Sequence, residues 1–276
     1  GDARIEDAFG AATIAGHADL GALTVGTLTI DTAAFTARVV NGATDFEVSA
    51  AGPDLMLTGT GGLAIDAGAT RISIASLDGT AFGFPVALAS PAEVSIADGV
   101  TRLSGVALSA GGGQVTVAGT VSPALDLGVA LENVAGGFVD AFVPGLDAAG
   151  TLNASATVAG TPDAPTFAWT ATWDGFALPA TRSAGLPPLA VTARGEGTAS
   201  ATSLDAQATA TGIALTATGK VPFDGSPVDI DVGGTINGVD LGQPVLAGLL
   251  AGETTLSANV GTGPGGRLTV SDVAVA

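Results

Sequence analysis

The chain has 276 residues, of which 47% are hydrophobic and 12% are charged. This composition excludes an intrinsically disordered chain, and the length is sufficient for one or two domains. Eight basic and 26 acidic residues give a formal net charge of −18, so a phosphate backbone would be repelled and nucleic acid is excluded as a partner. The absence of cysteine excludes disulfide bonds and thiolate chemistry.

Turn-forming residues are frequent, with 42 glycines and 14 prolines between short apolar runs. With a turn roughly every 8 to 12 residues, the chain is predicted to form on the order of 20 to 24 strands in an all-β, antiparallel-rich fold. The first strand-like segments lie around Leu23, around Leu28, and at 46–50, 55–58, 72–75, 94–97 and 106–109. Because neighbouring strands are about 4.8 Å apart, one continuous sheet of this many strands would be elongated, on the order of 100 Å long.

A regular series of amphipathic strands follows. In 124–134, Leu127 and Val129 alternate with Asp126 and Gly128. Successive side chains on a strand point to opposite faces, so this alternation predicts a half-buried strand. The pattern recurs at 115–121, 167–173, 213–217 and 228–236. Three arrangements could bury the apolar face: the sheet closes on itself as a sandwich, it wraps as a solenoid, or it stays open as a groove that holds a ligand. The uneven spacing of the strands argues against a solenoid.

Two segments have helical rather than strand-like spacing. Residues 134–143 and 243–251 each carry apolar side chains four positions apart. Pro144 ends the first segment, and Pro244 suits the first turn of the second. Both segments follow two strands and precede a glycine turn and another strand, so 119–158 and 219–260 are predicted to form a weak internal repeat. Two short helices are too few to cover some twenty strands.

Candidate catalytic and metal-binding residues are sparse. His17 is the only histidine, and a solvated or strand-edge position is the interpretation we favour for it. Asp229 and Asp231 lie two apart and share one strand face, where they could bind calcium or act as an acid/base pair. Apolar residues flank both aspartates, which indicates instead that the aspartates lie on the solvent-exposed face of an amphipathic strand.

Two further patterns have ordinary structural explanations. Gly261, Gly263 and Gly266 match the spacing of a dinucleotide-binding loop, but a strand-like run follows them where such a site needs a helix, which indicates a simple loop. Trp169 and Trp173 share a strand face with Phe167 and form the one concentration of large aromatic side chains. Core packing and ligand lining explain this cluster equally well.

Three stretches carry a family resemblance. The sequences GTLNASATVAGTPDAP at 150–165, GGQVTVAGTV at 112–121 and GGRLTVS at 265–271 are similar to a recurring unit of the TamB branch of the AsmA-like bacterial envelope proteins. This resemblance implies a curved, U-shaped sheet, or β-taco, whose apolar groove conducts phospholipid across the periplasm during cell-envelope biogenesis. It also implies an inner-membrane anchor and an outer-membrane barrel partner, as in the translocation and assembly module. We expect the chain to use no cofactor. We expect residues 1–276 to be one elongated segment of such a longer protein.

The expected lining of the groove follows from the alternation and the resemblance together. The residues assigned to it are Val115, Val117, Val121, Leu125, Leu127, Val129, Leu131, Leu152, Val158, Phe167, Trp169, Trp173, Ile213, Leu215, Val228, Ile230, Val232, Leu256, Leu268 and Val270. Two other hypotheses stay open. One is a structural or adhesive extracellular β-protein with a closed core, and the other is an enzyme that acts on carbohydrate through Asp229 and Asp231. The leading hypothesis is a lipid-conducting, non-enzymatic groove.

Overall fold

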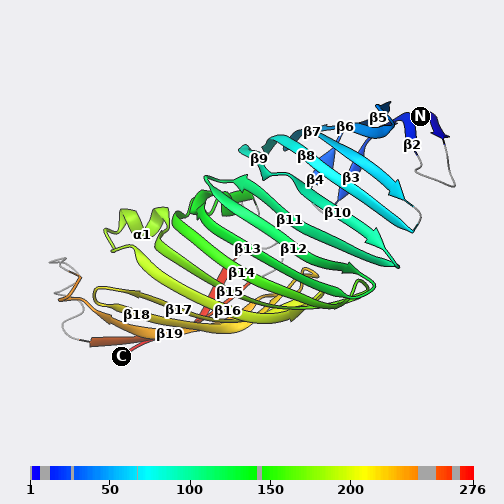
Figure 1. The fold of residues 1–276 in the computed structure, drawn as a ribbon. Helices are drawn as coiled ribbons and strands as arrows, with labels where there is room; N and C mark the ends of the chain where they lie inside the picture. Colours follow the sequence, from blue (N-terminus) through cyan, green and yellow to red (C-terminus); the bar gives the residue numbers. More distant parts are fainter. Residues whose placement is uncertain are drawn as a thin grey trace. The chain divides into compact units, whose positions relative to one another are not determined.

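Turns that contain glycine, proline or aspartate divide the chain into β-strands, and most of the loops between them are short (Figure 1). The computed structural model describes residues 2–6, 13–25, 28–66, 68–141, 145–241, 253–262 and 268–276. Asn41 and Gly42, for example, both have positive φ angles, as a tight two-residue hairpin turn requires. The described part contains 21 strands, which agrees with the number predicted from turn spacing. The prediction of an all-β, antiparallel fold is confirmed.

Nineteen of the described strands belong to one sheet, and every described pairing in it is antiparallel. The two remaining strands, β3 (Leu23–Val25) and β4 (Leu28–Ile30), form a separate hairpin. The chain divides into two compact units. Unit 1 comprises Gly1–Leu131 with Gly160–Pro162, and unit 2 comprises Glu132–Ala159 with Asp163–Ala276.

Unit 1 is built from strands that pair mainly with their neighbours in the sequence. They are β1 (Asp2–Glu6), β2 (Thr13–Leu20), β5 (Thr32–Val40), β6 (Ala43–Gly52), β7 (Leu55–Asp66), β8 (Ala69–Ala81), β9 (Phe84–Ser90), β10 (Ala92–Ala97), β11 (Val100–Ala110), β12 (Gly113–Ser122) and most of β13 (Leu125–Ala135). Both β9 and β10 pair with β8 on one side and with β11 on the other. They therefore occupy one strand position, which Pro91 interrupts because proline has no N–H for the ladder.

Unit 2 continues the same hairpin pattern. Its strands are β14 (Ala149–Thr161), β15 (Ala164–Ala177), β16 (Leu189–Thr198), β17 (Ala201–Ala210), β18 (Ile213–Pro222), β19 (Asp229–Asn237), β20 (Glu253–Thr262) and β21 (Leu268–Val275). From β15 to β21 each strand pairs with the next. In the part of the chain that the structure describes, β20 is the only strand that pairs with β21, so the other side of β21 is an edge.

Helical structure is scarce and differs in detail from the prediction. The segment predicted as helical at 134–143 begins as the end of β13 and continues as a 3-10 helix, η1 (Gly136–Ala141). Two consecutive glycines open this segment, and glycine disfavours a regular α-helix. The second predicted helix, 243–251, lies outside the described residues. An α-helix that was not predicted, α1 (Pro179–Ser183), connects β15 to β16 (Figure 1).

Very few apolar side chains are fully buried. Among the described residues nine are, and six of these are alanines. The larger ones, Leu55, Val134 and Ile213, lie at or close to strand ends next to connecting segments. A closed domain of this length would bury many large side chains instead. The apolar residues of the strand centres must therefore lie on incompletely covered surfaces.

Candidate functional site

The register of unit 1 places apolar side chains in rows across its strands. Leu63, Ile72, Val94 and Leu103 form one such row, each directly opposite the next, on β7, β8, β10 and β11. Opposed residues of antiparallel strands point to the same side of the sheet. The row one position away carries Gly62, Ser73, Glu93 and Ser104. We call the side of the first row the apolar face of unit 1 and the other side its polar face.

Unit 2 has a longer row of the same kind. Across the seven strands β15 to β21, the residues directly opposite one another are Trp173, Val191, Ala208, Leu215, Gly234, Leu256 and Val275. The adjacent row on the other side of the sheet consists of Thr172, Thr192, Gln207, Thr216, Gly233, Ser257 and Ala274. We call these sides the apolar and polar faces of unit 2.

Most predicted lining residues of unit 2 lie on its apolar face. The register brings together Phe167, Trp169, Trp173, Ile213, Leu215, Ile230, Val232, Leu256 and Val270. The Ser155 hydroxyl contacts the hydroxyl of Thr170 on the polar face at 3.0 Å, so alternation assigns Leu152 and Val158 to the apolar side. Val228 is half-buried just before β19, and the side chain of Leu268 lies outside what the structure describes.

In unit 1 the placement of the predicted residues is regular except at one bulge. Val115 and Val117 lie opposite Leu108 and Val106 on the apolar face. The register shifts between Thr101 and Arg102, which leaves Val121 as an extra residue without an opposed partner. At Val121 the alternation between the two faces of β12 shifts by one residue, so that Ser122 rather than Val121 lies on the apolar face. On β13 the predicted residues Leu125, Leu127, Val129 and Leu131 are all half-buried, whereas Asp126 and Gly128 are exposed.

The apolar faces are partly shielded, in unit 1 by β2 and β4, which contact β6 and β7, and in unit 2 by Gly136 of η1, which lies against the Trp173 ring. Their side chains are mostly half-buried, while those of the polar faces are mostly exposed, for example along β7, β16 and β18. Within each unit, the main contacts between described elements join neighbouring strands, with additional contacts from β2 and β4 to β6 and β7. The shielding therefore comes from neighbouring side chains and from local folding at the strand ends.

The additional contacts show that unit 1 bends towards its apolar face near β2. In a flat sheet β2 would be three strand spacings, roughly 14 Å, from β7. Parts of the two backbones nevertheless approach within 8 Å of each other. The Ile14 N–H donates to Oγ1 of Thr44 at 2.9 Å, and Thr44, on the apolar face, is only 1% exposed. The backbone of Thr29 in β4 also occupies the space where Gly52 would carry a Cβ.

The two tryptophans are anchored to the sheet itself. Nε1–H of Trp169 donates to Oγ1 of Thr202 at 2.8 Å, and Nε1–H of Trp173 donates to the Ala149 carbonyl at 3.0 Å. Trp173 also meets Phe176 edge to face, with ring centroids 4.9 Å apart. Both tryptophans are half-buried, so part of each side chain is accessible to solvent.

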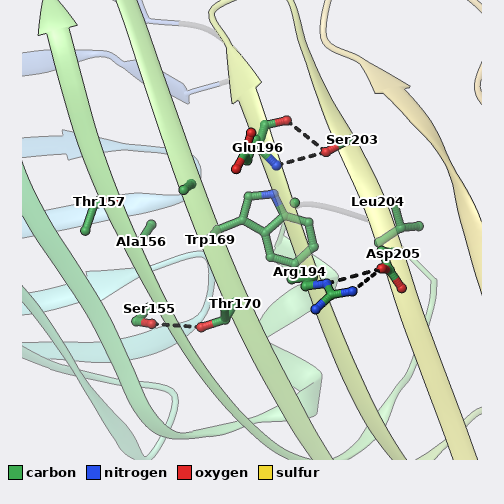
Figure 2. Close-up of a pocket in the computed structure, with 12 residues that line it drawn as sticks. Ser155, Ala156, Thr157, Trp169, Thr170, Arg194, Glu196, Ser203, Leu204 and Asp205 are labelled. Carbon is green, nitrogen blue, oxygen red and sulfur yellow. Dashed lines mark hydrogen bonds and ion pairs between the residues drawn. The ribbon is translucent and has the colours of Figure 1, made fainter.

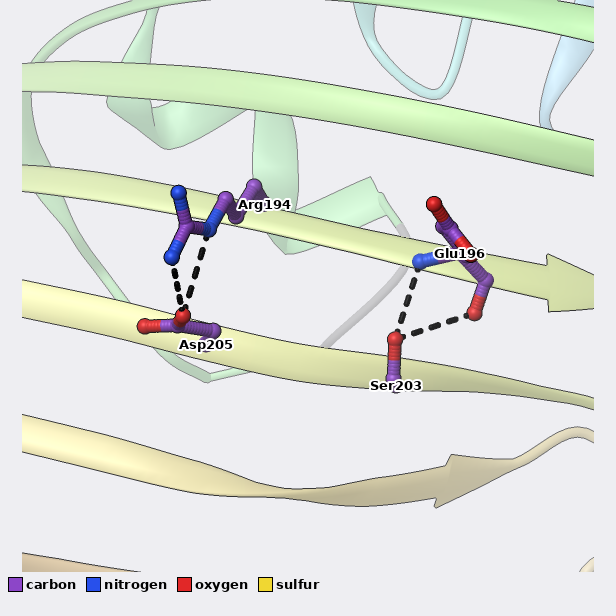
Figure 3. Close-up of polar contacts among 4 residues, drawn as sticks. All are labelled: Arg194, Glu196, Ser203 and Asp205. Atoms are coloured by element: carbon purple, nitrogen blue, oxygen red, sulfur yellow. Dashed lines mark hydrogen bonds and ion pairs between the residues drawn. The ribbon is translucent and has the colours of Figure 1, made fainter.

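The polar face of unit 2 has a depression of about 510 Å³ over β14 to β17 (Figure 2). Figure 3 shows its main polar contacts. Arg194 donates to Oδ2 of Asp205 from Nε at 3.1 Å and from Nη2 at 2.6 Å. The Ser203 hydroxyl accepts from the Glu196 N–H at 2.9 Å and donates to the Glu196 carbonyl at 3.1 Å.

These contacts connect neighbouring strands and do not activate any side chain for catalysis. A serine nucleophile needs a neighbouring general base, but the Ser203 hydroxyl is held by backbone groups. The Arg194–Asp205 pair is largely exposed, so its net contribution to stability is about 0–1 kcal/mol. We therefore interpret this depression as an ordinary irregularity of the polar face rather than as an active site.

The other candidate residues occupy the positions that the simpler interpretation predicts. The Asn259 amide donates to Oδ1 of Asp229 at 2.6 Å and to Oδ1 of Asp231 at 3.2 Å, and all three residues lie on the polar face. His17 is on the polar face of β2, 3.9 Å from the Asp19 carboxylate, with its side chain 55% exposed. Gly261 lies within β20 near its end, and the next element is a strand, β21, whereas Gly263 and Gly266 lie outside the described residues.

Sequence reasoning missed the N-terminal half of the candidate surface. Ile72, Val94 and Leu103 belong to the apolar face of unit 1 as clearly as Leu215 belongs to that of unit 2. The segments of Ile72 and Val94 are predicted as strands, and the same alternation could have identified the face of these two residues. The phase change at Ala75, which the register leaves unpaired between β7 and β8, obscures the pattern in β8.

Among the described residues, no group of three or more histidine, aspartate or glutamate side chains is placed to hold a metal ion. In the same part of the chain, no helix has the length and hydrophobicity needed to cross a bilayer. Comparison with protein-family models, curated proteins and solved structures finds no match to the chain.

Proposed function

We propose that the apolar faces of both units bind the acyl chains of phospholipids. In this proposal, the chain is a segment of a curved, periplasmic groove that conducts phospholipid passively between the inner and outer membranes during envelope biogenesis. An inner-membrane anchor and an outer-membrane barrel partner would belong to the full-length protein. The observation that carries the proposal is the unbroken apolar row from Trp173 to Val275, which crosses seven strands and has half-buried rather than buried side chains at its centre.

The energetics of lipid transfer explain why such a surface is useful. Exposing one methylene to water costs about 0.8 kcal/mol, so moving a sixteen-carbon acyl chain through water costs on the order of 12 kcal/mol. An apolar sheet face removes most of this barrier because the acyl chain stays in contact with side chains such as Leu215 and Leu256. Ala208 in the same row carries only a methyl group, whereas the space at Gly234 is filled by the Leu215 side chain and its backbone.

The bending of unit 1 supports a concave binding surface. The hydrogen bond from Ile14 to Thr44 lies on the apolar side, so the sheet curls with its apolar face inward near β2. A concave face contacts a larger fraction of a bound chain than a flat one, as is typical of small-molecule sites. The polar faces, with ion pairs such as Arg71–Glu93 at 3.2 Å, would face water.

A structural or adhesive β-protein with a closed, dry core is the competing hypothesis. It requires large apolar side chains to be buried by the protein itself. Only Leu55, Val134 and Ile213 among the described large aliphatic residues meet that condition, which favours a ligand-binding surface.

The two hypotheses differ in whether lipid accompanies the protein. Lipid should be extracted from the purified chain and quantified by mass spectrometry against a mock purification from cells that lack it. We expect phospholipid enriched well above the mock level. Lipid at the mock level, from protein whose circular dichroism shows an intact β-fold, would contradict the proposal and favour the closed-core alternative.

A further inference from the structure

The basic side chains of the described strands from β5 onward all lie on the polar faces. Register places Arg38 opposite Asp45, Arg71 opposite Ser95, Arg102 opposite Thr120, Arg194 opposite Asp205, and Lys220 opposite Asp229. Each of these rows is one position away from an apolar row, so its side chains point to the other side of the sheet. Over these strands, the apolar faces consequently present no described lysine or arginine.

Several of these cations also have acidic partners on their own face. Arg38 lies 3.6 Å from Glu47, Arg71 lies 3.2 Å from Glu93, and Arg194 contacts Asp205. Outside the strands, Arg182 of α1 donates to the backbone carbonyls of Ala177 and Asp147 at 2.8 and 3.2 Å. Protein sites that recognise an anionic phosphate or carboxylate rely on such cations, and here these cations are turned away from the apolar faces or engaged elsewhere.

Acidic residues occupy the ends of the strands. Asp54, Asp98, Asp163 and Asp224 lie in turns where the apolar and polar faces meet, in a chain of net charge −18. The Ser226 hydroxyl and backbone N–H lower the pKa of the Asp224 carboxyl, which is therefore ionised at neutral pH. A headgroup at the boundary of an apolar face would meet negative potential rather than a counter-charge.

We propose that the apolar faces select acyl-chain lipids whose headgroups carry no net charge, zwitterionic or uncharged, over anionic lipids with the same chains. This inference rests on the proposed function, because it concerns the ligand of the same surface. It follows from the charge distribution of the two faces rather than from their hydrophobicity. Repulsion between an anionic headgroup and several aspartate carboxylates about 10 Å away in water should weaken binding of an anionic lipid roughly tenfold, relative to an uncharged lipid with the same chain.

The two tryptophans provide an intrinsic probe, since both lie on the apolar face of unit 2. Palmitoyl lysophosphatidylcholine and palmitoyl lysophosphatidylglycerol should be titrated as monomers against the purified chain while tryptophan emission is followed. At about 0.01 M salt we expect the zwitterionic lipid to bind about tenfold more tightly. The difference should shrink at about 0.15 M salt, because the Debye length falls from about 30 Å to about 8 Å.

A matched pair of variants tests the cause. Leu215→Lys places a cation on the apolar face, opposite Ala208 and Gly234, and should selectively strengthen binding of the anionic lipid. Thr216→Lys places the same charge on the polar face and should leave the preference unchanged. The salt dependence of the unmodified chain tests the same point without any substitution.

The outcomes separate the two proposals. Equal affinities, or tighter binding of the anionic lipid, would overturn the charge selection while leaving acyl-chain binding intact. Binding of neither lipid to the folded chain would overturn the proposed function and the charge selection with it.

Discussion

At the scale of single residues, aromatic side chains lie over glycines on the neighbouring strand. Phe46 is opposite Gly61, Phe167 is opposite Gly197, and Trp169 is opposite Gly195. A Cβ at Gly197 or Gly195 would lie 2.5 Å from the Phe167 ring or 2.7 Å from the indole nitrogen of Trp169. Glycine at these positions lets the aromatic ring lie against the backbone of the neighbouring strand. This contact fixes the register of the strands in a sheet that has few other buried side chains.

The substitution Gly195→Ala should displace the Trp169 indole and weaken its hydrogen bond to Thr202. The added methyl would also overlap the Ser203 carbonyl oxygen, so we expect the free energy of unfolding to fall by about 1–3 kcal/mol. Urea denaturation and tryptophan emission measure the two effects. Gly233→Ala is the matched control, because its Cβ would come no closer than 3.8 Å to the Leu256 carbonyl oxygen. Equal stability of the two variants would contradict the role of the ring–glycine contact.

At the scale of elements, the connection through α1 is held by the side-chain hydrogen bonds of Arg182 and Thr181. Arg182 donates to carbonyls of two connecting regions, Ala177 at the end of β15 and Asp147 before β14. The helix is only five residues long, too short to be stable alone in water. Its position therefore depends on these hydrogen bonds and on Thr181, whose hydroxyl bonds both backbone groups of Leu178.

Replacing Arg182 with glutamine should loosen this connection without unfolding the sheet. We expect faster hydrogen exchange at the amides of Ala184, Gly185 and Leu186, whose hydrogen bonds close the helix and its exit. Arg102→Gln, on the polar face of β11, should leave that exchange unchanged. Unaltered exchange in Arg182→Gln would show that the arginine does not hold the helix.

Strands were predictable from the sequence because alternation and turns are local properties. The face of Leu215 and Ile230 followed directly from their spacing, and the register places both on the apolar face. Bulges were not predictable in the same way, because the unpaired position of Val121 depends on the strand opposite. The helix α1 was missed even though Pro179 stands in its first turn, since five residues are too few to show a helical period.

At the scale of the whole molecule, the proposed function belongs to a surface rather than to a single residue. The rows of each unit separate apolar from polar side chains over many consecutive strands. The candidate site could be predicted only as a list of alternating residues. Whether those residues share one face depends on register, which long-range pairing decides.

Photo-crosslinking at neighbouring positions tests the central claim most directly. A photoreactive residue should replace Leu215 or Thr216 in unit 2, and Ile72 or Ser73 in unit 1, because the two positions of each pair lie on opposite faces of the same strand. After irradiation in cells, we predict lipid adducts at Leu215 and Ile72 and background levels at Thr216 and Ser73. Equal adducts within each pair, or none at any position in folded protein, would contradict a lipid-binding apolar face.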